Sequence, residues 1–427
     1  MKHEVIEKTL PSWLKIWFIH VPEDTLFNFR IYLNSWDQFT PEWKYEVSHI
    51  LEHCLFEKNK NFKDSLDFKI EVERLWASRN WATSYNSNWY MINWVIEKKF
   101  QLIDLLLKQI FEAELNQDDF VKQKEVIKNE LTRAKNDHHR EHSIKVSQSI
   151  KKWLRTFEER LEMLDNVKFE DVIAYYEEFY VQANCTFLFS WNIKDDIPEI
   201  EKIVSEYFKD KTIWSKKELD FWVSKDYAGK TYFKELQEKT SFDFNLRFLI
   251  ETEDLELKEQ YIIFLNLFMS WLWSRIQNKA REMWLIYTLH STSFIDKNYI
   301  NIWFAENASW EKLIPLIKLI IDEMKDIFAW NIDDKEFDRA MWFLYWNLQK
   351  RYIVWESILW YYTDQIVYDD FWKPLPEYLE RVKTFTKEDI VAFWKSFDFS
   401  NWIFSILWNW AEEKAEEIWK FLKSYTS

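Results

Sequence analysis

The segment from Ser35 to His53 reads SWDQFTPEWKYEVSHILEH. Its last five residues place His49, Glu52 and His53 in the pattern H-x-x-E-H. On a helix, positions i and i+4 share a face, so both imidazoles can reach one metal ion. Glu52 projects about one residue's rotation away, where it can reach a metal-bound water without being a ligand. The segment therefore predicts a helix that begins near Pro41 and holds part of a metal site.

The pattern H-x-x-E-H is the inverted zinc-peptidase motif. A hydrolytic zinc site needs three protein ligands and one open position, so the third ligand must come from elsewhere in the chain. A pair of polar histidines on an amphipathic helix fits the same five residues, and the motif needs its structural context.

Composition excludes several classes of protein. A chain of 427 residues with 48% hydrophobic and 30% charged residues is typical of a globular protein with two or more domains. The net charge of -15 argues against nucleic acid and against an anionic membrane surface as partners. Two cysteines, Cys54 and Cys185, give no disulfide framework, and the first residues lack the apolar core of a signal peptide. We expect a cytoplasmic enzyme or binding protein.

Glycine is nearly absent and tryptophan is in excess. The chain has 1 Gly and 28 Trp, whereas average usage gives roughly 30 glycines in a chain of this length. Pairs such as Ser35-Trp36, Glu42-Trp43 and Asn80-Trp81 stand where turns are expected. We hypothesise that most of these Trp codons are UGA, which some genetic codes read as Trp and others as Gly. The alternative is a protein that is truly rich in Trp.

With Trp read as Gly, the first part of the chain resolves into regular elements. Alternating apolar residues predict strands over Leu14 to Val21 and Leu26 to Asn34, and a further strand over Tyr90 to Glu97. Helical periodicity predicts helices over Gln101 to Leu115 and Asp118 to Asp137.

The chain contains an internal repeat. Residues Phe169 to Ile193 resemble Lys387 to Trp410, since each has an acidic helix start, an aromatic-rich helix and an apolar strand that ends in Trp-Asn. So long an offset indicates domain duplication. We expect an α+β protein of two duplicated domains, residues 1–215 and 225–427, each a mainly antiparallel sheet packed against helices, with a metal site in the first domain alone.

The segment around HILEH resembles the family that includes pitrilysin, insulin-degrading enzyme and the mitochondrial processing peptidases. Glu130, in VIKNELTRA, follows His53 with 76 residues between, which is the family's spacing to its ligand glutamate. The segment ERLWASRNWATSYNS resembles the family's strand "L-G-A-x-x-N-A-x-T-S", with Trp76 at a glycine position. The resemblance covers nearly the whole chain.

The resemblance implies a LuxS- and processing-peptidase-like metallohydrolase fold and a zinc-dependent endopeptidase. His49, His53 and Glu130 would bind one Zn²⁺ per chain, and Glu52 would act as the general base. The substrate would be a peptide or an unfolded segment.

By the same resemblance, the peptide would add as a strand along Asn80, Trp81 and Ala82. The segment AREMWLIYTLHS resembles the family's R-x-x-x-G-L-x-Y segment, which makes Arg281 and Tyr287 the candidates for contacting substrate near the scissile bond. The spacing here is one residue shorter than the usual pattern.

Two features depart from or extend the resemblance. Gln123 stands where the family often has a second glutamate, seven residues before Glu130. Family members of about this length hold half of the full chamber, which implies a homodimer or a heterodimer with a related subunit.

A non-catalytic peptide-binding or structural subunit is the alternative function. An aromatic-rich carbohydrate binder is a third, which holds only if the Trp count is real. The histidines of NDHHREHS (136–143) are expected at a solvated helix end or loop.

Overall fold

The structure is a computed structural model, and it describes most of the chain. The described residues are 2–35, 39–41, 43–83, 88–209, 224–236, 242–270, 273–287, 289–351, 355–368 and 373–426. Within these ranges no helix combines the length and apolar character needed to cross a membrane.

The chain divides into two compact units. Unit 1 comprises residues 1–141, 153–220 and 354–369, and unit 2 comprises residues 142–152, 221–353 and 370–427. Each unit therefore includes one short segment from the other half of the sequence. The predicted boundary between residues 215 and 225 falls almost entirely outside the described residues.

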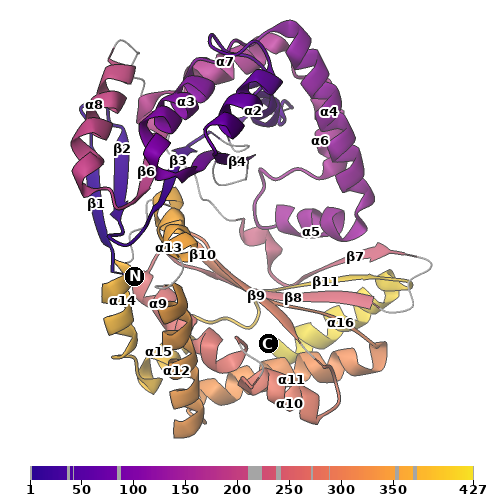
Figure 1. Cartoon of the computed structure of the whole chain (residues 1–427). Coiled ribbons are helices and arrows are strands. Elements are labelled where there is room, and N and C mark those ends of the chain that lie inside the picture. The colour runs from indigo at the N-terminus through magenta and orange to yellow at the C-terminus, as the bar shows by residue number, and fades with distance from the viewer. Residues whose placement is uncertain are drawn as a thin grey trace. The chain divides into compact units, whose positions relative to one another are not determined.

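Unit 1 is built on a mixed sheet with the strand order β1-β2-β6-β3-β5-β4 (Figure 1). Among the described strands of this sheet, only β2 and β6 pair in parallel. The strands are β1 (Glu4–Thr9), β2 (Lys15–His20), β3 (Leu26–Leu33), β4 (Ser78–Thr83), β5 (Asn88–Val95) and β6 (Cys185–Trp191). The helices of this unit are α1 (Val47–Cys54), α2 (Ser65–Arg74), α3 (Lys99–Phe111), α4 (Gln117–Asn136), α6 (Phe157–Leu164), α7 (Phe169–Phe179), α8 (Ile197–Phe208) and α13 (Trp355–Tyr368).

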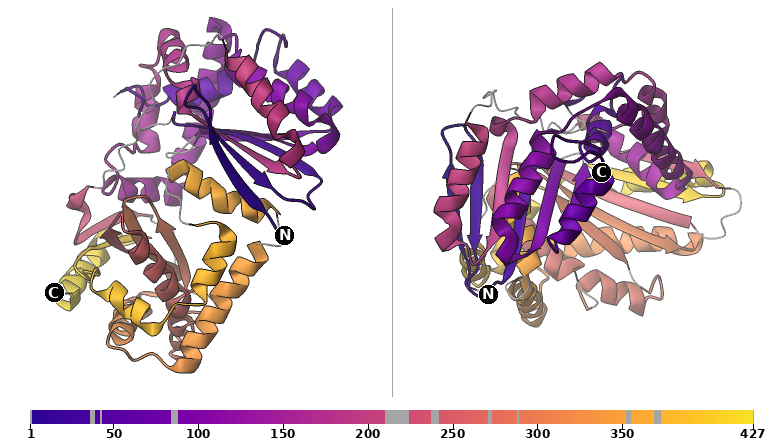
Figure 2. Two further views of the ribbon diagram at one scale, coloured as in Figure 1. Left: turned by 90° about the vertical axis from the view of Figure 1, so that its left-hand side faces the viewer. Right: turned by 45° about the horizontal axis from the view of Figure 1, so that its top comes forward.

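Residues of β3 alternate between two packed faces, as the period of a strand requires. Phe29 packs on Phe187 of β6, which in turn contacts Phe111 of α3, so this face lies under helices of unit 1 (Figure 2). The neighbouring residue Arg30 faces the other way and donates to the hydroxyl of Thr363 in α13. Both faces of the sheet are therefore covered, and α13 closes the second one with polar contacts.

Unit 2 repeats this topology with one strand fewer among the described residues. Its strand order is β7-β11-β8-β10-β9, again with one parallel pair, β7 with β11. The strands are β7 (Lys230–Glu235), β8 (Phe242–Glu251), β9 (His290–Ile295), β10 (Tyr299–Ala308) and β11 (Trp402–Trp408). The helices are α9 (Leu255–Phe268), α10 (Arg275–Glu282), α11 (Trp310–Phe328), α12 (Asp334–Arg351), α14 (Leu375–Val382), α15 (Lys387–Trp394) and α16 (Ala411–Thr426).

The predicted repeat falls on equivalent elements of the two units. Its first copy covers α7 and β6, and its second covers α15 and β11. In each sheet the repeat's strand, β6 or β11, pairs in parallel with the strand on one side and is followed on the other side by three antiparallel strands. The two sheets therefore have the same strand order. The prediction of an α+β fold with two duplicated domains is confirmed.

Two local predictions need correction. The metal-site helix begins at Val47, later than the predicted start near Pro41, because residues 43–46 form turns before the helix. The prediction of a solvated helix end holds for His138 and His139, which are exposed at the start of α5 (His138–Gln148), but it is wrong for His142, which is buried.

The described tryptophans include a group with left-handed backbone. Every non-Gly residue of positive φ in the described part of the chain is a Trp, and the described Gly229 shares this conformation. These residues are Trp13, Trp43, Trp76, Trp284, Trp330 and Trp410, with φ between 56° and 70°. L-residues other than glycine rarely adopt this region. The backbone therefore supports the hypothesis that glycine is the natural residue at these positions. The other residue of the opening turn, Trp36, lies outside the described part.

Three of these tryptophans end helices in the same way. After α2, the Trp76 amide donates to the Glu73 carbonyl and the Ala77 amide to the Val72 carbonyl. This is the Schellman arrangement, whose left-handed residue is usually glycine. The residues Trp284 after α10 and Trp330 after α11 stand at the same position with the same pair of hydrogen bonds.

Candidate metal centre

The two histidines of the motif lie on one face of α1 and meet a carboxylate from α4. The Glu130 Oε2 atom lies 3.6 Å from His49 Nε2 and 3.9 Å from His53 Nε2. One ligand atom from each of the three residues lies within 4.8 Å of the other two, and no other such group occurs among the described residues. The two imidazoles therefore lie together on one face of the helix, as their spacing predicted, and Glu130 is the third member of the group.

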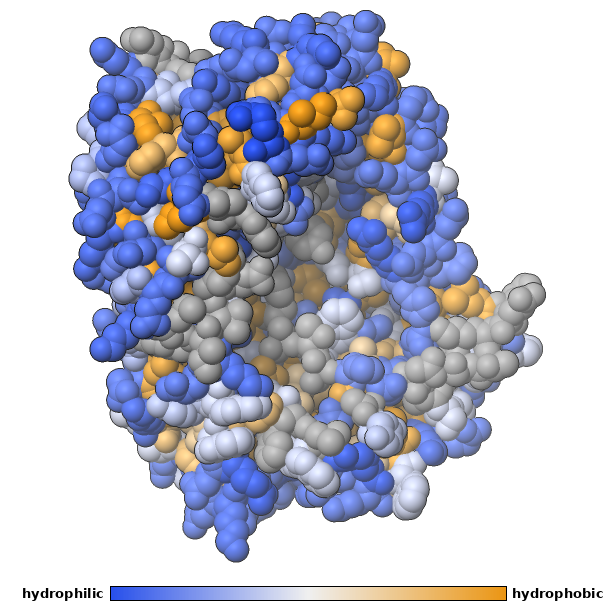
Figure 3. All heavy atoms as spheres, viewed as in Figure 1, coloured by the Kyte–Doolittle hydropathy of each residue, from blue (hydrophilic) through white to orange (hydrophobic). Residues whose placement is uncertain are grey.

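This donor set fits a zinc ion. Two imidazole nitrogens and one carboxylate oxygen are a common ligand set of catalytic zinc, which leaves a fourth position open. Bonds of about 2.0–2.1 Å in a tetrahedron place ligand atoms roughly 3.4 Å apart, close to the two distances from Glu130. The side chain of Glu130 is half exposed, and the surface over α4 is mostly hydrophilic (Figure 3). The group is therefore open to water.

A buried carboxylate supports His49. Glu46, the residue before α1, is completely buried, and its Oε2 lies 2.9 Å from His49 Nδ1. Arg160 of α6 donates to both oxygens of Glu46. Burial opposes ionisation of Glu46, but the charge of Arg160 and the hydrogen bonds from His49 and Arg160 outweigh it and lower the pKa to about 2. Burial likewise opposes protonation of His49, yet the hydrogen bond and charge of Glu46 raise its pKa overall.

His53 has a neutral partner in the same position. Its Nδ1 lies 3.0 Å from the side-chain oxygen of Gln123, and the Gln123 amide donates to Glu57. Lys122 then pairs with Glu57 at 2.8 Å. His53 therefore has an uncharged acceptor in Gln123, and the nearest charge in this chain of hydrogen bonds is that of Glu57.

Glu52 is buried on α1 and contacts the end of β4. The Thr83 hydroxyl donates to Glu52 Oε2, which leaves the second carboxylate oxygen for another partner. Sequence reasoning found Glu52 but not Thr83, Glu46, Arg160 or Glu57. Of these, Thr83 stands in the segment ERLWASRNWATSYNS that resembles the family's strand, and Glu46 stands three residues before His49, hence about one helical turn away. Arg160 and Glu57 had no local signal.

The predicted peptide-binding residues Asn80, Trp81 and Ala82 lie on β4, which is an edge strand among the described strands. The ring of Trp81 stacks on Phe56 at 4.0 Å between centroids. An edge strand presents unpaired backbone groups that an extended peptide can join. The strand thus has the geometry that this role needs.

The other two predicted substrate contacts belong to unit 2. Arg281, in the last turn of α10, donates to the Gln277 carbonyl at 3.1 Å and lies over the ring of Trp273. Tyr287 is 85% exposed. Trp284 between them holds φ of 56°, at the glycine position of the segment.

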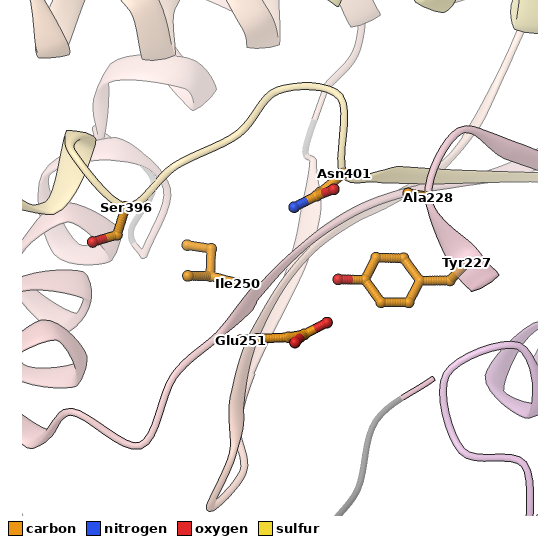
Figure 4. Close-up of a pocket in the computed structure, with 6 residues that line it drawn as sticks. All are labelled: Tyr227, Ala228, Ile250, Glu251, Ser396 and Asn401. Carbon is orange, nitrogen blue, oxygen red and sulfur yellow. The ribbon is translucent and has the colours of Figure 1, made fainter. Parts of the chain in front are cut away.

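Two other features of the chain lack the chemistry of a catalytic site. The thiol of Cys54 is buried, which raises its pKa to about 12 and keeps it protonated. A pocket of about 280 Å³ in unit 2 brings the Glu251 carboxylate and the Tyr227 hydroxyl toward one space, next to Asn401 (Figure 4). Among the described residues, its lining has a single carboxylate and no histidine or cysteine.

The fold and the site define a class: a duplicated α+β protein whose first unit carries a His-His-Glu group on an H-x-x-E-H helix. Comparison with protein families gives the same answer. Residues 41–152 match the insulinase model of peptidase family M16, and residues 166–344 match the peptidase M16 inactive domain. The chain belongs to peptidase family M16. No curated protein sequence matches it.

Solved structures share the fold at low sequence identity. A protease from Helicobacter pylori has a TM-score of 0.81 and 15% identity, over 95% of this chain and 99% of that chain. A peptidase M16 inactive domain from Pseudomonas fluorescens has a TM-score of 0.80 and 12% identity, over 95% of this chain and 98% of that chain. The periplasmic protease PqqL from Escherichia coli has a TM-score of 0.77 and 15% identity, over 100% of this chain and 51% of that chain.

Proposed function

We propose that the chain is a zinc-dependent metalloendopeptidase that hydrolyses peptides or unfolded polypeptide segments. The observation that carries the proposal is the convergence of His49, His53 and Glu130 on one point, within a segment that matches the insulinase model. These three residues would hold a zinc ion, which would acidify a water molecule and polarise the scissile carbonyl.

The side chains around this point have separate tasks. Glu52 accepts the proton of the attacking water and passes it to the leaving amine. The Thr83 hydroxyl donates to one oxygen of Glu52, which leaves the other oxygen to accept the proton. The edge of β4, at Asn80, Trp81 and Ala82, binds the peptide as an added strand. Arg281 and Tyr287 are proposed as oxyanion contacts on the resemblance of their segment.

The substitution Glu52→Gln tests this function. It keeps the size of the side chain and the ligands of the metal, but it removes the base. We expect zinc content to stay at one ion per chain while hydrolysis of a quenched fluorescent peptide library falls at least about 10²-fold. Undiminished turnover by the zinc-loaded variant would refute the mechanism.

A non-catalytic subunit is the second candidate. The match of residues 166–344 to the inactive domain of the family favours it, although that range contains none of the three ligand residues. Elemental analysis separates the candidates, because a structural subunit would carry no zinc when purified.

We also propose a second subunit, either a copy of this chain or a related one. The support is that PqqL has about twice the length of this chain, which spans 51% of it. A cytoplasmic location remains a proposal too, supported by two buried cysteines that form no disulfide.

A further inference from the structure

Glu46 carries a buried negative charge but is not one of the three candidate metal ligands. Its carboxylate is completely buried at the start of α1. It accepts hydrogen bonds from Arg160 Nε at 2.5 Å and from Arg160 Nη2 at 2.9 Å, and it lies 2.9 Å from His49 Nδ1. Burying a charge is costly unless it is paired and hydrogen-bonded. The Arg160 fork meets that requirement alone, so the contact with His49 is an additional feature.

The contact has a consequence for the His49 ring. An imidazole that donates from Nδ1 has its lone pair on Nε2. In His49 this is the nitrogen that lies 3.6 Å from Glu130 Oε2, within the candidate metal group. A carboxylate acceptor also raises the basicity of the ligand nitrogen. Since Arg160 fixes both oxygens of Glu46, the acceptor cannot rotate away from the ring.

We propose that Glu46, held by Arg160, is the positioning residue that sets the ring orientation and tautomer of His49 for metal binding. This inference rests on the proposed function, because it concerns the same metal. His53, by comparison, has the neutral Gln123 as its acceptor. The two histidines are therefore supported unequally, and loss of the charged partner should weaken metal binding more.

The competing explanation is a purely structural ion pair that joins α6 to the start of α1. The two explanations differ in what they predict for zinc affinity. A structural pair would change the free energy of unfolding and leave the affinity of the folded protein unchanged.

The test uses the full chain and Zn²⁺ affinity, measured by competition with a chromogenic chelator. Glu46→Gln retains a neutral acceptor and should weaken zinc binding about 10-fold. The double variant Glu46→Leu/Arg160→Met removes both polar partners and leaves His49 Nδ1 without an acceptor, so we expect a loss near 100-fold. The visible spectrum of the Co²⁺-loaded protein should also change in these variants, because the orientation of one ligand is altered.

Lys44→Met is the matched control. Lys44 lies two residues before Glu46 and pairs with Asp171 of α7 at 2.7 Å. Its loss breaks an ion pair of the same turn without touching His49, so zinc affinity should stay within about 2-fold of wild type.

The outcomes are separable. The inference is overturned if Glu46→Gln and the double variant bind zinc as tightly as wild type, or if Lys44→Met weakens binding as much as they do. Should the double variant not fold, as judged by circular dichroism, Glu46→Gln decides alone. Failure of the proposed function has a different signature, since wild type and Lys44→Met would then both fail to bind Zn²⁺.

Discussion

At the scale of the residue, six tryptophans hold backbone conformations that suit glycine. All are more than half exposed, so their side chains have space and the strain lies in the backbone. A left-handed conformation costs an ordinary L-residue roughly 1–2 kcal/mol. Replacement by glycine removes this cost, but part of the gain is lost because glycine has more conformational entropy in the unfolded chain. We predict that Trp76→Gly raises the free energy of unfolding by about 1 kcal/mol, measured by urea denaturation.

A matched control lies in the middle of α12. Trp342 is also exposed but stands inside a regular helix, where glycine lowers stability by about 1 kcal/mol relative to good helix formers. Trp342→Gly should therefore shift the urea midpoint in the opposite direction. If both substitutions destabilise the protein equally, the positive φ of Trp76 carries no strain. The gene sequence provides an independent check, because UGG codons at the six positions would end the recoding hypothesis.

At the scale of the element, the turn between β2 and β3 contains a carboxyl group whose burial disfavours its charge. Asp24 is buried, and burial raises its pKa despite hydrogen bonds from the Leu26 and Thr25 amides. A folded-state pKa above the unfolded value means that ionisation destabilises the fold, and that this penalty disappears as the pH falls below both values. We predict that Asp24→Asn is more stable than wild type at pH 7, and that the difference declines with falling pH.

Unfolding by urea at several pH values measures this difference. In wild type, Asp24 Oδ1 accepts a hydrogen bond of 2.9 Å from the Leu26 amide. The side-chain oxygen of Asn can accept the same hydrogen bond, so the turn itself should persist. Glu125→Gln, on the exposed side of α4, would serve as the control for charge removal away from the turn. Equal stability of Asp24→Asn and wild type across the range would show that Asp24 is fully solvated when ionised.

Most elements, and the two histidine ligands, follow from local patterns in the sequence, whereas Glu130 follows only from the resemblance to the family. The alternation over residues 14–34 gave β2 and β3 to within one or two residues, and the spacing of His49 and His53 placed both on one face of α1. The partners of these ligands do not follow. Arg160 reaches Glu46 from a helix 114 residues away in sequence, and only the packing of α6 brings the two together. Gln123 was recognised as a departure, yet its contact with Glu57 depends on how α1 and α4 pack.

At the scale of the whole molecule, sequence halves and compact units do not coincide. α13 belongs to unit 1, and residues 142–152 belong to unit 2. The polar face of β3, where Arg30 and Tyr32 contact Thr363, explains the first assignment. The apolar cluster of Val146, Ile150 and Leu249 explains the second. Neither assignment could be predicted from the internal repeat or from a change in composition along the chain, because each depends on contacts between residues far apart in the sequence.

The proposed second subunit gives a prediction about concentration. If the partner is a second copy that completes the substrate chamber, hydrolysis per chain should fall when wild type is diluted below the dimer dissociation constant, while zinc per chain stays constant. Glu52→Gln provides the complementing subunit, since it lacks the base but keeps the fold. Added in excess to dilute wild type, it should restore hydrolysis per wild-type chain, and light scattering should show twice the chain mass. Light scattering that shows a single chain, with hydrolysis per chain independent of dilution and of added Glu52→Gln protein, would exclude a homodimer as the active form.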